Sequence, residues 1–409
     1  MNILTGIYLV MFFIGLFLIF IFIILHLRYR KSLNAYPVPK SYPTISILVP
    51  AYNEEKNIGE TIRCLLALKY PKGRKEIIVI NDGSRDRTAE VVRKFTEKHK
   101  EITLIDKPNS GKANSLNYAL KRTRGDLIAV VDADSYPNQD ALEKMVGHFE
   151  DEKVAAVTSR VLVKNKERML GKFQVMDYSI IAWTRKLLDF VDSVYVTNGP
   201  LSIYRSSVIK RLGGFDPTNL TEDIEITWHV LSEGYKTRMS YSAIVYTSVP
   251  LDLKTWIKQR VRWNLGGIQT VRKYYKSMFS NAGNMFGYFV VPYVSASFIL
   301  AIVGILLFIR YVWVKGTYQL LSAYYALQGY DYFRYFEFSF SFTLLIFFGA
   351  LFFICSIFHY KMGFRNSETG DKSVLKILAY SVLYRALYII PLVAALYKLA
   401  KGDLRWYTK

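Results

Sequence analysis

The chain has 409 residues, of which 51% are hydrophobic, and its formal net charge is +21. This length suits one sizeable soluble domain with membrane segments, or two to three soluble domains. The positive charge raises nucleic-acid binding as a possibility, but the sequence has neither zinc-finger spacing nor an aromatic RNA-binding signature. We therefore expect no nucleic-acid partner. The two cysteines, Cys64 and Cys355, form no evident pair or metal site.

Four stretches are long and apolar enough to cross a bilayer core, which takes roughly 18 or more residues. They are Ile3–Leu27, Met285–Val314, Phe336–His359 and Leu375–Leu396. Arg28, Arg30 and Lys31 directly follow the first stretch, which places that side in the cytosol by the positive-inside rule. We predict a multi-pass protein of the plasma membrane with a cytosolic domain between its first two spans.

The membrane region contains one conflict and two unusual charges. Four full spans that start from an outside N-terminus leave the C-terminus outside, yet the tail is basic: Lys398, Lys401, Arg405 and Lys409. Either one stretch is not a complete span or the rule fails here. Arg385 and Glu337 lie within predicted spans. Charged side chains are costly there, so each indicates either a polymer path or an ion pair or carbonyl contact between packed helices.

From Pro43 onward the chain alternates short β-branched runs with helical patterns. Strands are predicted at 44–49, 76–80, 102–105 and 126–131, and helices at 54–68, 88–99, 112–123 and 140–149. This alternation indicates a parallel sheet covered on both faces, whose ligands bind at the carboxyl ends of the strands. Each strand is followed by a polar segment, in turn PAYNE, NDGS, KPNSGK and DADS. Four such segments in series predict one composite site.

Asp132 and Asp134 lie two residues apart after an apolar run. On an extended chain they point the same way, so their carboxylates converge. A divalent cation would relieve their repulsion and would bind substrate phosphates as well. An isolated Asp-Ala-Asp is more often a turn, but the other polar strand ends favour a metal and phosphate site.

Asp82 and Lys112 each have an ordinary explanation and a functional one. Asp82 either caps the Asp-Gly-Ser turn or belongs to the site. Lys112 begins a predicted helix behind Ser110 and Gly111, a setting that suits a phosphate, although an exposed lysine is the usual alternative. A P-loop is excluded because GxxxxGK[ST] is absent.

The acidic pair Glu222 and Asp223 opens another predicted helix. A capping box with Asn219 as N-cap accounts for Glu222. It leaves Asp223 as either a surface residue or a general base.

The segment KQRVRWNLGG, residues 258–267, combines basic and aromatic side chains. On a helix, Gln259, Arg262 and Trp263 share one face, although Trp and Arg also suit a helix on a membrane surface. The two uses are compatible if Lys258 and Arg260 face lipid while the other face meets a ligand.

PAYNE, NDGS, SGKANSLN, DAD, TED and QRVRW occur in this order between about Tyr42 and Gly267. Together they resemble the membrane-embedded family 2 glycosyltransferases, including the Gln-x-x-Arg-Trp signature of synthases of chitin, cellulose, hyaluronan and poly-N-acetylglucosamine. One span before the domain and three after it are most similar to bacterial poly-N-acetylglucosamine and rhizobial chitin-oligosaccharide synthases. The resemblance implies an α/β GT-A-type catalytic domain with a Rossmann-like mixed sheet, an α-helical transmembrane region, a UDP-sugar donor, Mg²⁺ or Mn²⁺, and inversion at the anomeric carbon.

The resemblance also implies roles for the motif residues. Asp134 would coordinate the metal, Asp223 of the TED motif would be the general base beside Glu222, and Gln259 and Trp263 would line the acceptor site. The donor-binding residues that it implies are Tyr52, Glu54, Asp82, Lys112, Asp132 and Arg262. The segment 198–201, Asn-Gly-Pro-Leu, matches the donor-pocket loop of the family more loosely.

Four parts are thus expected along the chain: a transmembrane helix at 1–27, a cytosolic GT-A domain at 28–252, interfacial amphipathic helices at 253–283, and three spans at 284–409. The expected function is processive transfer of a sugar, N-acetylglucosamine in the first instance, to a growing β-linked polysaccharide, coupled to its export. The lipid bilayer is an expected partner, and a small accessory membrane subunit fits this layout. The alternatives are a non-processive transferase acting on a lipid carrier and a non-catalytic sugar-nucleotide-binding export subunit.

Overall fold

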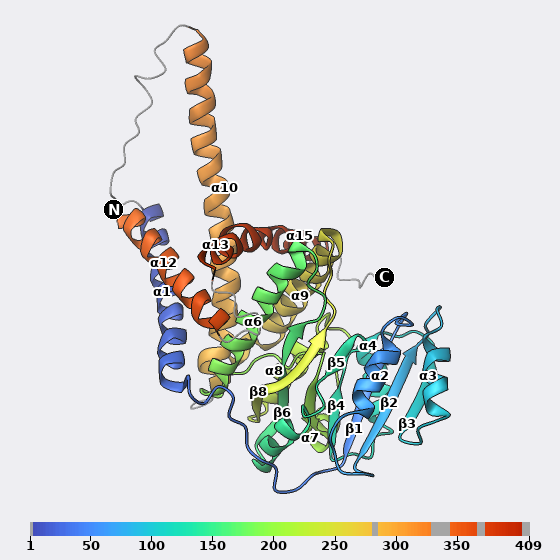
Figure 1. The fold of residues 1–409 in the computed structure, drawn as a ribbon. Helices are drawn as coiled ribbons and strands as arrows, with labels where there is room; N and C mark the ends of the chain where they lie inside the picture. The colour runs from blue at the N-terminus through green and yellow to red at the C-terminus, as the bar shows by residue number, and fades with distance from the viewer. Residues whose placement is uncertain (1–2, 280–284, 329–343, 366–372, 403–409) are drawn as a thin grey trace. The chain divides into compact units, whose positions relative to one another are not determined.

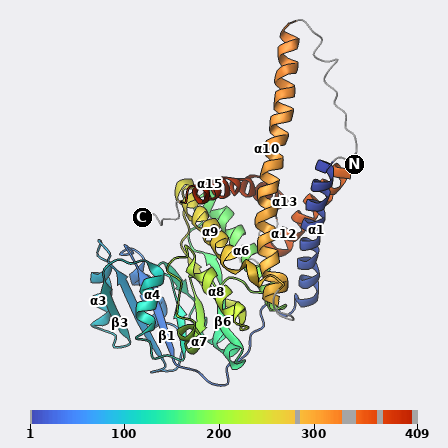
Figure 2. The same cartoon turned by 180° about the vertical axis from the view of Figure 1, so that it is seen from behind.

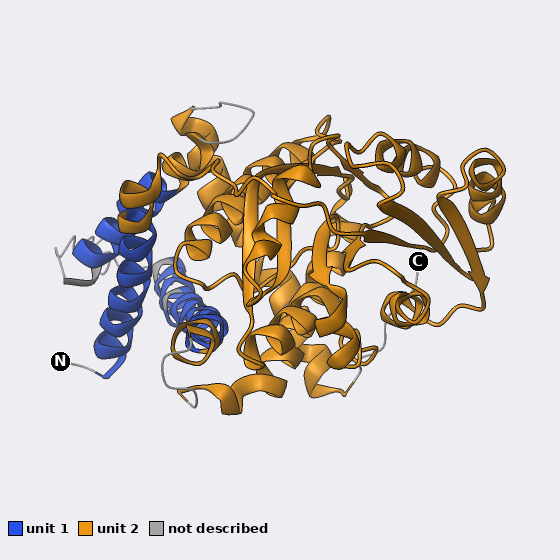
Figure 3. Cartoon of the chain, turned by 90° about the horizontal axis from the view of Figure 1, so that it is seen from below, with its two compact units in different colours: residues 1–23, 292–359 blue, residues 24–291, 360–409 orange. Residues whose placement is uncertain are grey.

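The computed structural model describes residues 3–279, 285–328, 344–365 and 373–402. The chain forms two compact units, one of residues 1–23 and 292–359 and the other of residues 24–291 and 360–409 (Figure 3). The second unit holds the sheet and every predicted site residue. Glu337 lies outside the described residues.

The second unit is built on a mixed eight-stranded sheet with strand order β3-β2-β1-β4-β7-β6-β8-β5 (Figure 1). The first four of these strands are parallel, as predicted, whereas β7 is antiparallel to both of its neighbours, β4 and β6. The strands are β1 (Ile45–Ala51), β2 (Lys75–Asp82), β3 (Ile102–Lys107), β4 (Leu127–Val130), β5 (Ser135–Pro137), β6 (Val154–Val163), β7 (Ser202–Arg205) and β8 (Lys236–Thr247).

Helices cover both faces of this sheet because its central strands are apolar on both sides. Ile47 and Val49 of β1 pack with Ile58 on one face, while Leu48 packs with Leu116 on the other. Successive residues of a strand point to opposite faces, so a fully buried strand needs apolar residues at every position. The covering helices are α2 (Ile58–Leu66), α3 (Thr88–Thr96), α4 (Lys112–Leu120), α5 (Glu143–Val146), α6 (Met169–Asp189), α7 (Ser206–Arg211) and α8 (Glu222–Ser232).

The amphipathic helix α9 (Leu253–Tyr274) lies against α8 and carries the Gln-x-x-Arg-Trp segment (Figure 2). It begins at its N-cap Asp252, whose side chain accepts a hydrogen bond from the Thr255 amide at 2.8 Å. A Cβ on Gly266 would lie 2.1 Å from Oγ1 of Thr221, the residue before α8. Glycine at this position therefore allows the close approach of α9 to the start of α8.

Within the described residues, four helices are long and apolar enough to cross a membrane: Ile3–Tyr29, Phe286–Tyr325, Ile346–Arg365 and Val374–Ala400. Each overlaps one of the four predicted stretches. The first is α1, the second comprises a π-helical turn, Phe286–Val290, and α10 (Val291–Leu327), and the third lies in α12 (Leu344–Arg365). The fourth comprises α13 (Val374–Ala379), a π-helical turn at Tyr380–Tyr384, α14 (Arg385–Leu387) and α15 (Ile389–Ala400).

Candidate active site

The turn after β1 carries Tyr52 and Glu54 and is tied to the turn after β2. Between them, Asn53 has φ 56°, in the left-handed region that Asn tolerates better than most residues. Its amide donates to Oγ of Ser84 at 3.0 Å, and its Oδ1 accepts from the Arg85 amide at 2.9 Å. The side chains of Tyr52 and Glu54 remain partly exposed beside this junction.

Asp82, at the end of β2, is enclosed by the next strand-end segment. Its carboxylate accepts from Nζ of Lys107 at 2.5 Å and from the amides of Ser110 and Gly111 at 2.9 and 2.8 Å. Burial alone would raise the pKa of this carboxyl, but these donors outweigh burial and lower it. The alternative that Asp82 merely caps its own turn is wrong, because Asn81 Oδ1 accepts the Ser84 amide instead.

Lys112, the first residue of α4, joins two motifs that are far apart in the sequence. Its Nζ lies 2.6 Å from Oδ1 of Asp132 and 2.7 Å from Oε1 of Glu222. Burial opposes ionisation of Glu222, but the Lys112 ammonium and then the Arg262 guanidinium lower its pKa. We call Lys112, Asp132, Glu222 and Asp223 the carboxylate cluster.

The capping-box explanation for Glu222 is wrong. Helix α8 begins at Glu222 itself, and its N-cap Thr221 makes no side-chain capping bond. Asn219 instead turns the preceding loop, with its Oδ1 accepting the Thr221 amide at 2.9 Å. Glu222 is buried and paired with Lys112 rather than turned back on its own helix.

Asp223 occupies the next position of the first turn of α8 and is partly exposed. Burial raises the pKa of its carboxyl to about 6, and the neighbouring Glu222 carboxylate acts in the same direction. Lys112 and Arg262 act in the opposite direction. Asp223 can therefore exchange a proton near neutral pH, which general acid-base chemistry requires.

The loop before β7 closes over the cluster. A Cβ on Gly199 would lie 2.6 Å from Oδ2 of Asp132 and 2.9 Å from Nζ of Lys112. Glycine is therefore required for the loop to approach this ion pair. Beside it, Oδ1 of Asn198 accepts from Oγ1 of Thr158 at 2.5 Å and from the Arg185 guanidinium.

Arg185, which no sequence motif pointed to, also lies beside the cluster through its hydrogen bond to Asn198. It lies near the C-terminal end of α6. Burial lowers the pKa of its guanidinium, while Tyr195 and then the Asp223 carboxylate act in the opposite direction. Helix α6 lies outside the ordered strand-end motifs. The only signal in the sequence is a basic residue within a largely apolar helix.

Asp132 and Asp134 flank the buried Ala133 after β4, and both are partly exposed. Among the described residues no three His, Cys, Asp or Glu side chains are grouped to hold a metal ion. Mg²⁺ commonly takes only one or two carboxylates and completes its shell with substrate phosphates and waters. The donor set therefore fits a divalent cation that binds together with a diphosphate.

Helix α9 brings Gln259, Arg262 and Trp263 toward the start of α8. Nη1 of Arg262 lies 3.5 Å from the Leu220 carbonyl, and its charge lowers the pKa of Glu222. Oε1 of Gln259 is buried and has no hydrogen-bond partner in the part of the chain that the structure describes. A buried acceptor without a partner is costly.

The prediction that Arg260 faces lipid is wrong, whereas Lys258 is exposed. Arg260 is only 1% exposed, and its Nη2 lies 3.3 Å from Oδ2 of Asp177, a buried residue of α6. Its guanidinium carbon stands 3.9 Å from the centre of the half-buried Trp263 ring. The buried carboxylate and the aromatic face together hold the arginine inside the protein.

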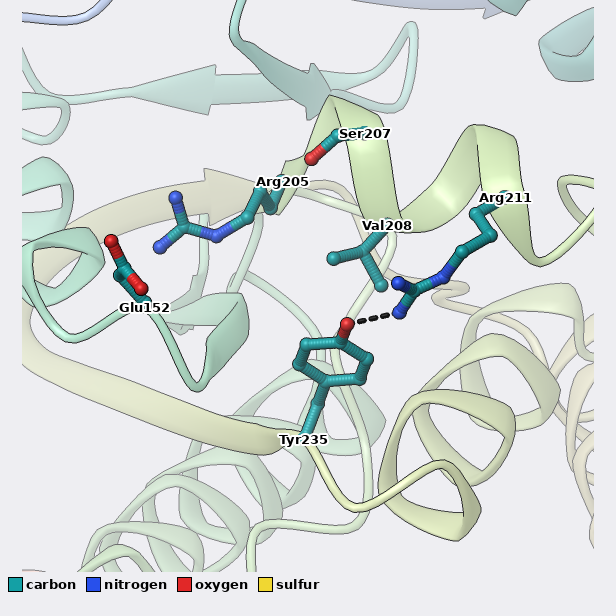
Figure 4. Close-up of a pocket in the computed structure, with 6 residues that line it drawn as sticks. All are labelled: Glu152, Arg205, Ser207, Val208, Arg211 and Tyr235. Carbon is teal, nitrogen blue, oxygen red and sulfur yellow. Dashed lines mark hydrogen bonds between the residues drawn. The ribbon is translucent and has the colours of Figure 1, made fainter.

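The structure thus brings the lysine and carboxylates of the cluster together, with Gly199, Arg185 and Arg262 beside them. Asp82 and Glu54, two of the predicted donor-binding residues, have separate partners: Asp82 binds Lys107, and Oε2 of Glu54 accepts from Nδ2 of Asn57 at 2.7 Å. A cavity of about 270 Å³ (Figure 4) lies elsewhere. One of its lining residues, Arg205, pairs with Leu127 at the beginning of β4, whereas the site follows the end of β4.

Comparison with known proteins matches residues 46–213 to the model of "Glycosyl transferase family 2". The poly-beta-1,6-N-acetyl-D-glucosamine synthase of Staphylococcus aureus (strain COL) is 36% identical over 237 residues, which cover 57% of either chain. The probable glycosyltransferase YdaM of Bacillus subtilis (strain 168) is 36% identical over 250 residues, or 59% of either chain. The match thus spans somewhat more than half the length of these relatives.

Among solved structures, the mannosyltransferase PcManGT from Pyrobaculum calidifontis, in complex with GDP-Man and Mn2+, is similar over 97% of this chain and 99% of its own. The TM-score is 0.60 and the sequence identity is 21%. At this identity the likeness concerns the fold. It confirms the predicted class, a GT-A-type mixed α/β sheet domain combined with several long apolar helices.

Proposed function

We propose that this chain, which carries a family 2 glycosyltransferase domain, is an inverting glycosyltransferase that extends a β-linked polysaccharide from a UDP-sugar at the membrane. The observation that carries the proposal is the carboxylate cluster. One lysine bridges Asp132 and Glu222, and the adjacent Asp223 has a pKa of about 6. This arrangement provides a phosphate-binding cation and a proton acceptor at one place.

The proposed reaction is a displacement at the anomeric carbon of the donor. A hydroxyl oxygen of the acceptor forms a bond to that carbon while the bond to the β-phosphate oxygen breaks, and UDP leaves with the bonding electron pair. The hydroxyl proton passes to the Asp223 carboxylate. A positioned base of this kind contributes typically ~10²–10⁴-fold to a rate.

The departing diphosphate accumulates negative charge, which nearby cations can stabilise. Lys112 would exchange a carboxylate partner for a phosphate oxygen, and Arg262 would approach from α9. Asp134 and Asp132 would hold Mg²⁺ or Mn²⁺, which neutralises phosphate charge when bound. Tyr52, Glu54 and Asp82 would hold the uridine at the ends of β1 and β2.

The acceptor would lie along α9. The Trp263 ring offers an apolar face for a pyranose, and the unpaired Oε1 of Gln259 offers an acceptor to a sugar hydroxyl. Stacking on an aromatic ring holds a sugar without fixing its position along the polysaccharide. The polysaccharide can therefore slide, which repeated addition of sugars requires. N-acetylglucosamine is the proposed sugar because the S. aureus relative is named for that polymer.

The proposal is tested with purified protein in lipid vesicles, Mg²⁺ or Mn²⁺, and radiolabelled UDP-N-acetylglucosamine, UDP-glucose or UDP-galactose. We expect a polymer from UDP-N-acetylglucosamine alone, loss of synthesis with EDTA and recovery when the metal is restored. Sizing the product separates the two transferase mechanisms, because single addition to a lipid carrier gives one short, organic-soluble product. Absence of transfer from every donor would contradict the proposed activity.

Trp263→Ala tests the acceptor assignment. We expect shorter product, or none, while hydrolysis of the donor continues, because the ring is proposed to hold the sugar rather than to react. An unchanged product length would show that Trp263 has no part in holding the acceptor. Lys258→Ala, on the exposed side of the same helix, is the matched control.

A further inference from the structure

The helix Val374–Ala400 qualifies as a membrane span by length and composition, but its contacts indicate another position. We propose that it lies along the membrane surface on the same side as the catalytic domain, with its exposed apolar face in the lipid. The contacts that hold this helix all lie within the second compact unit, and its position is independent of the identity of the donor sugar.

The beginning of this helix is held at α6. The ring of Tyr380 meets the rings of Tyr360 and Phe364 edge-on, with centroids 5.3 and 5.5 Å apart. Those two residues belong to the end of α12, where a Cβ on Gly363 would lie 2.3 Å from Cδ1 of Ile180 in α6. Helix α6 in turn packs on β6 and β8 and contributes Arg185 to the site.

The middle of the helix is fixed by a buried group that we call the tyrosine hub. At its centre Asp177 of α6, with its side chain 2% exposed, binds Arg260 of α9. It also accepts hydrogen bonds from the Tyr380 hydroxyl at 3.0 Å, the Tyr384 hydroxyl at 3.5 Å and the Tyr388 hydroxyl. The predicted alternative of an ion pair for Arg385 agrees with its 3.9 Å distance from the same carboxylate. The hub therefore joins three helices of one unit.

The end of the helix is held as well, by α9. Ala395 is buried with Val261 and Leu265, and Leu399 packs against the same cluster. Helix α15 lies beside α9 (Figures 1 and 2). Helix α9 lies outside the hydrocarbon, because its first turns carry exposed Lys254 and Lys258 and it touches the start of the catalytic helix α8.

These contacts exclude a crossing of the bilayer. The 27 residues rise ~40 Å at ~1.5 Å each, which exceeds the ~30 Å hydrocarbon core. A spanning helix of this length would carry one end to the far side, where the catalytic domain could not touch it. Here the beginning, the middle and the end all contact the same domain.

The face of the helix that points away from the catalytic domain has the composition of a lipid-contacting surface. Apart from the exposed Arg385, it is apolar. Its apolar side chains are exposed by between 39% and 77% at Val374, Leu375, Val382, Leu383, Ile389, Ile390, Val393 and Tyr397. Lys376 and Lys401 are exposed near its two ends. A long helix with one apolar face and flanking lysines fits an anionic leaflet. This helix also follows the candidate span Ile346–Arg365 closely in the sequence, which keeps it near the bilayer.

This placement removes the conflict in the sequence. Three crossing helices return the chain to the side of the domain, so Lys398 and Lys401 lie on the same side as Arg28, Arg30 and Lys31. The positive-inside rule is then satisfied at both places.

The test uses the full-length chain with Cys64→Ser and Cys355→Ser, reconstituted in vesicles of phosphatidylethanolamine and phosphatidylglycerol. Lys401→Cys reports the far end of the helix, and Lys72→Cys, exposed in the catalytic domain, is the reference. We expect a membrane-impermeant maleimide to label both from the same side of the vesicle. Labelling of the two cysteines from opposite sides would overturn the proposal.

A second measurement determines the depth of the middle of the helix. Nitroxide labels on Val382→Cys and Ile390→Cys, 52% and 48% exposed, should lie ~5–10 Å below the headgroups and respond more to dissolved oxygen than to a water-soluble nickel chelate. A depth near the bilayer centre would contradict an interfacial helix even if both ends lie on one side. Binding of UDP confirms that each variant is folded, and neither readout requires sugar transfer.

Discussion

The carboxylate cluster and the tyrosine hub both contain ion pairs, but they differ in how far their charges are removed from water. In the cluster, the side chains of Lys112 and Asp132 are 28% and 29% exposed. In the hub, those of Arg260 and Asp177 are 1% and 2% exposed. An exposed pair can exchange partners when a ligand arrives, whereas a buried pair that loses one member leaves the other charge without solvation. We therefore infer chemistry at the cluster and positioning at the hub.

Asp223→Asn tests the chemical role of the cluster most severely. We expect transfer to fall by ~10²–10⁴-fold, because the amide cannot accept the hydroxyl proton, while UDP binding is nearly unchanged. Initial rates and a UDP titration measure the two effects. Glu233→Gln, an exposed acid just after the same helix, is the control. Near-normal polymer yield from Asp223→Asn would remove the base assignment.

Asp177→Leu tests whether the hub is structural. We expect unfolding free energy to fall by ~3–5 kcal/mol, since Arg260 is left buried and uncompensated. The double variant Asp177→Leu with Arg260→Met should recover most of that stability in denaturant unfolding. The acceptor KM of the double variant should nevertheless be higher than that of the unmodified protein, because Trp263 has lost the Arg260 guanidinium that lies against it. Recovery of both stability and KM would show that the hub has no positioning role.

Gly199→Ala tests the close packing of the cluster. The added methyl group would lie within 3 Å of both Asp132 and Lys112, so the loop or the ion pair must move. We expect donor affinity to fall by ~10-fold, equivalent to ~1.4 kcal/mol, with little loss of stability. Isothermal titration with UDP measures this effect. Gly59→Ala, where the nearest atom is 3.5 Å away, should bind UDP normally.

Glu222→Gln should produce the smallest change, a shift in pH dependence. Asp223 is protonated below its pKa of about 6, so transfer should rise with pH through this region. The Glu222 charge raises that pKa. Its removal should therefore move the acid limb of kcat/KM to lower pH. A limb that stays in place would mean that another group controls it.

The sequence predicted the parallel strands well, because strand periodicity and polar strand ends are local signals. β1, β2 and β4 lie where their apolar runs predict. It could not show that Lys112 joins Asp132 to Glu222, because that contact depends on how the chain folds over more than a hundred residues. For the same reason the helical pattern wrongly placed Arg260 toward lipid. Its partner Asp177 lies 83 positions earlier, and the surrounding tyrosines come much later.

The hub also has a consequence for biosynthesis. Asp177 and Arg260 leave the ribosome well before the tyrosines at 380, 384 and 388. Domains generally fold from the N-terminal side during synthesis, so the sheet can form while these two charges still lack their hydroxyl partners. Helix α9, which carries Trp263, gains its last contacts only after the helix at Val374–Ala400 has been synthesised. Under the proposed function, a chain truncated before this helix would keep the strand ends proposed to bind the nucleotide but would lack the contacts that fix the proposed acceptor helix.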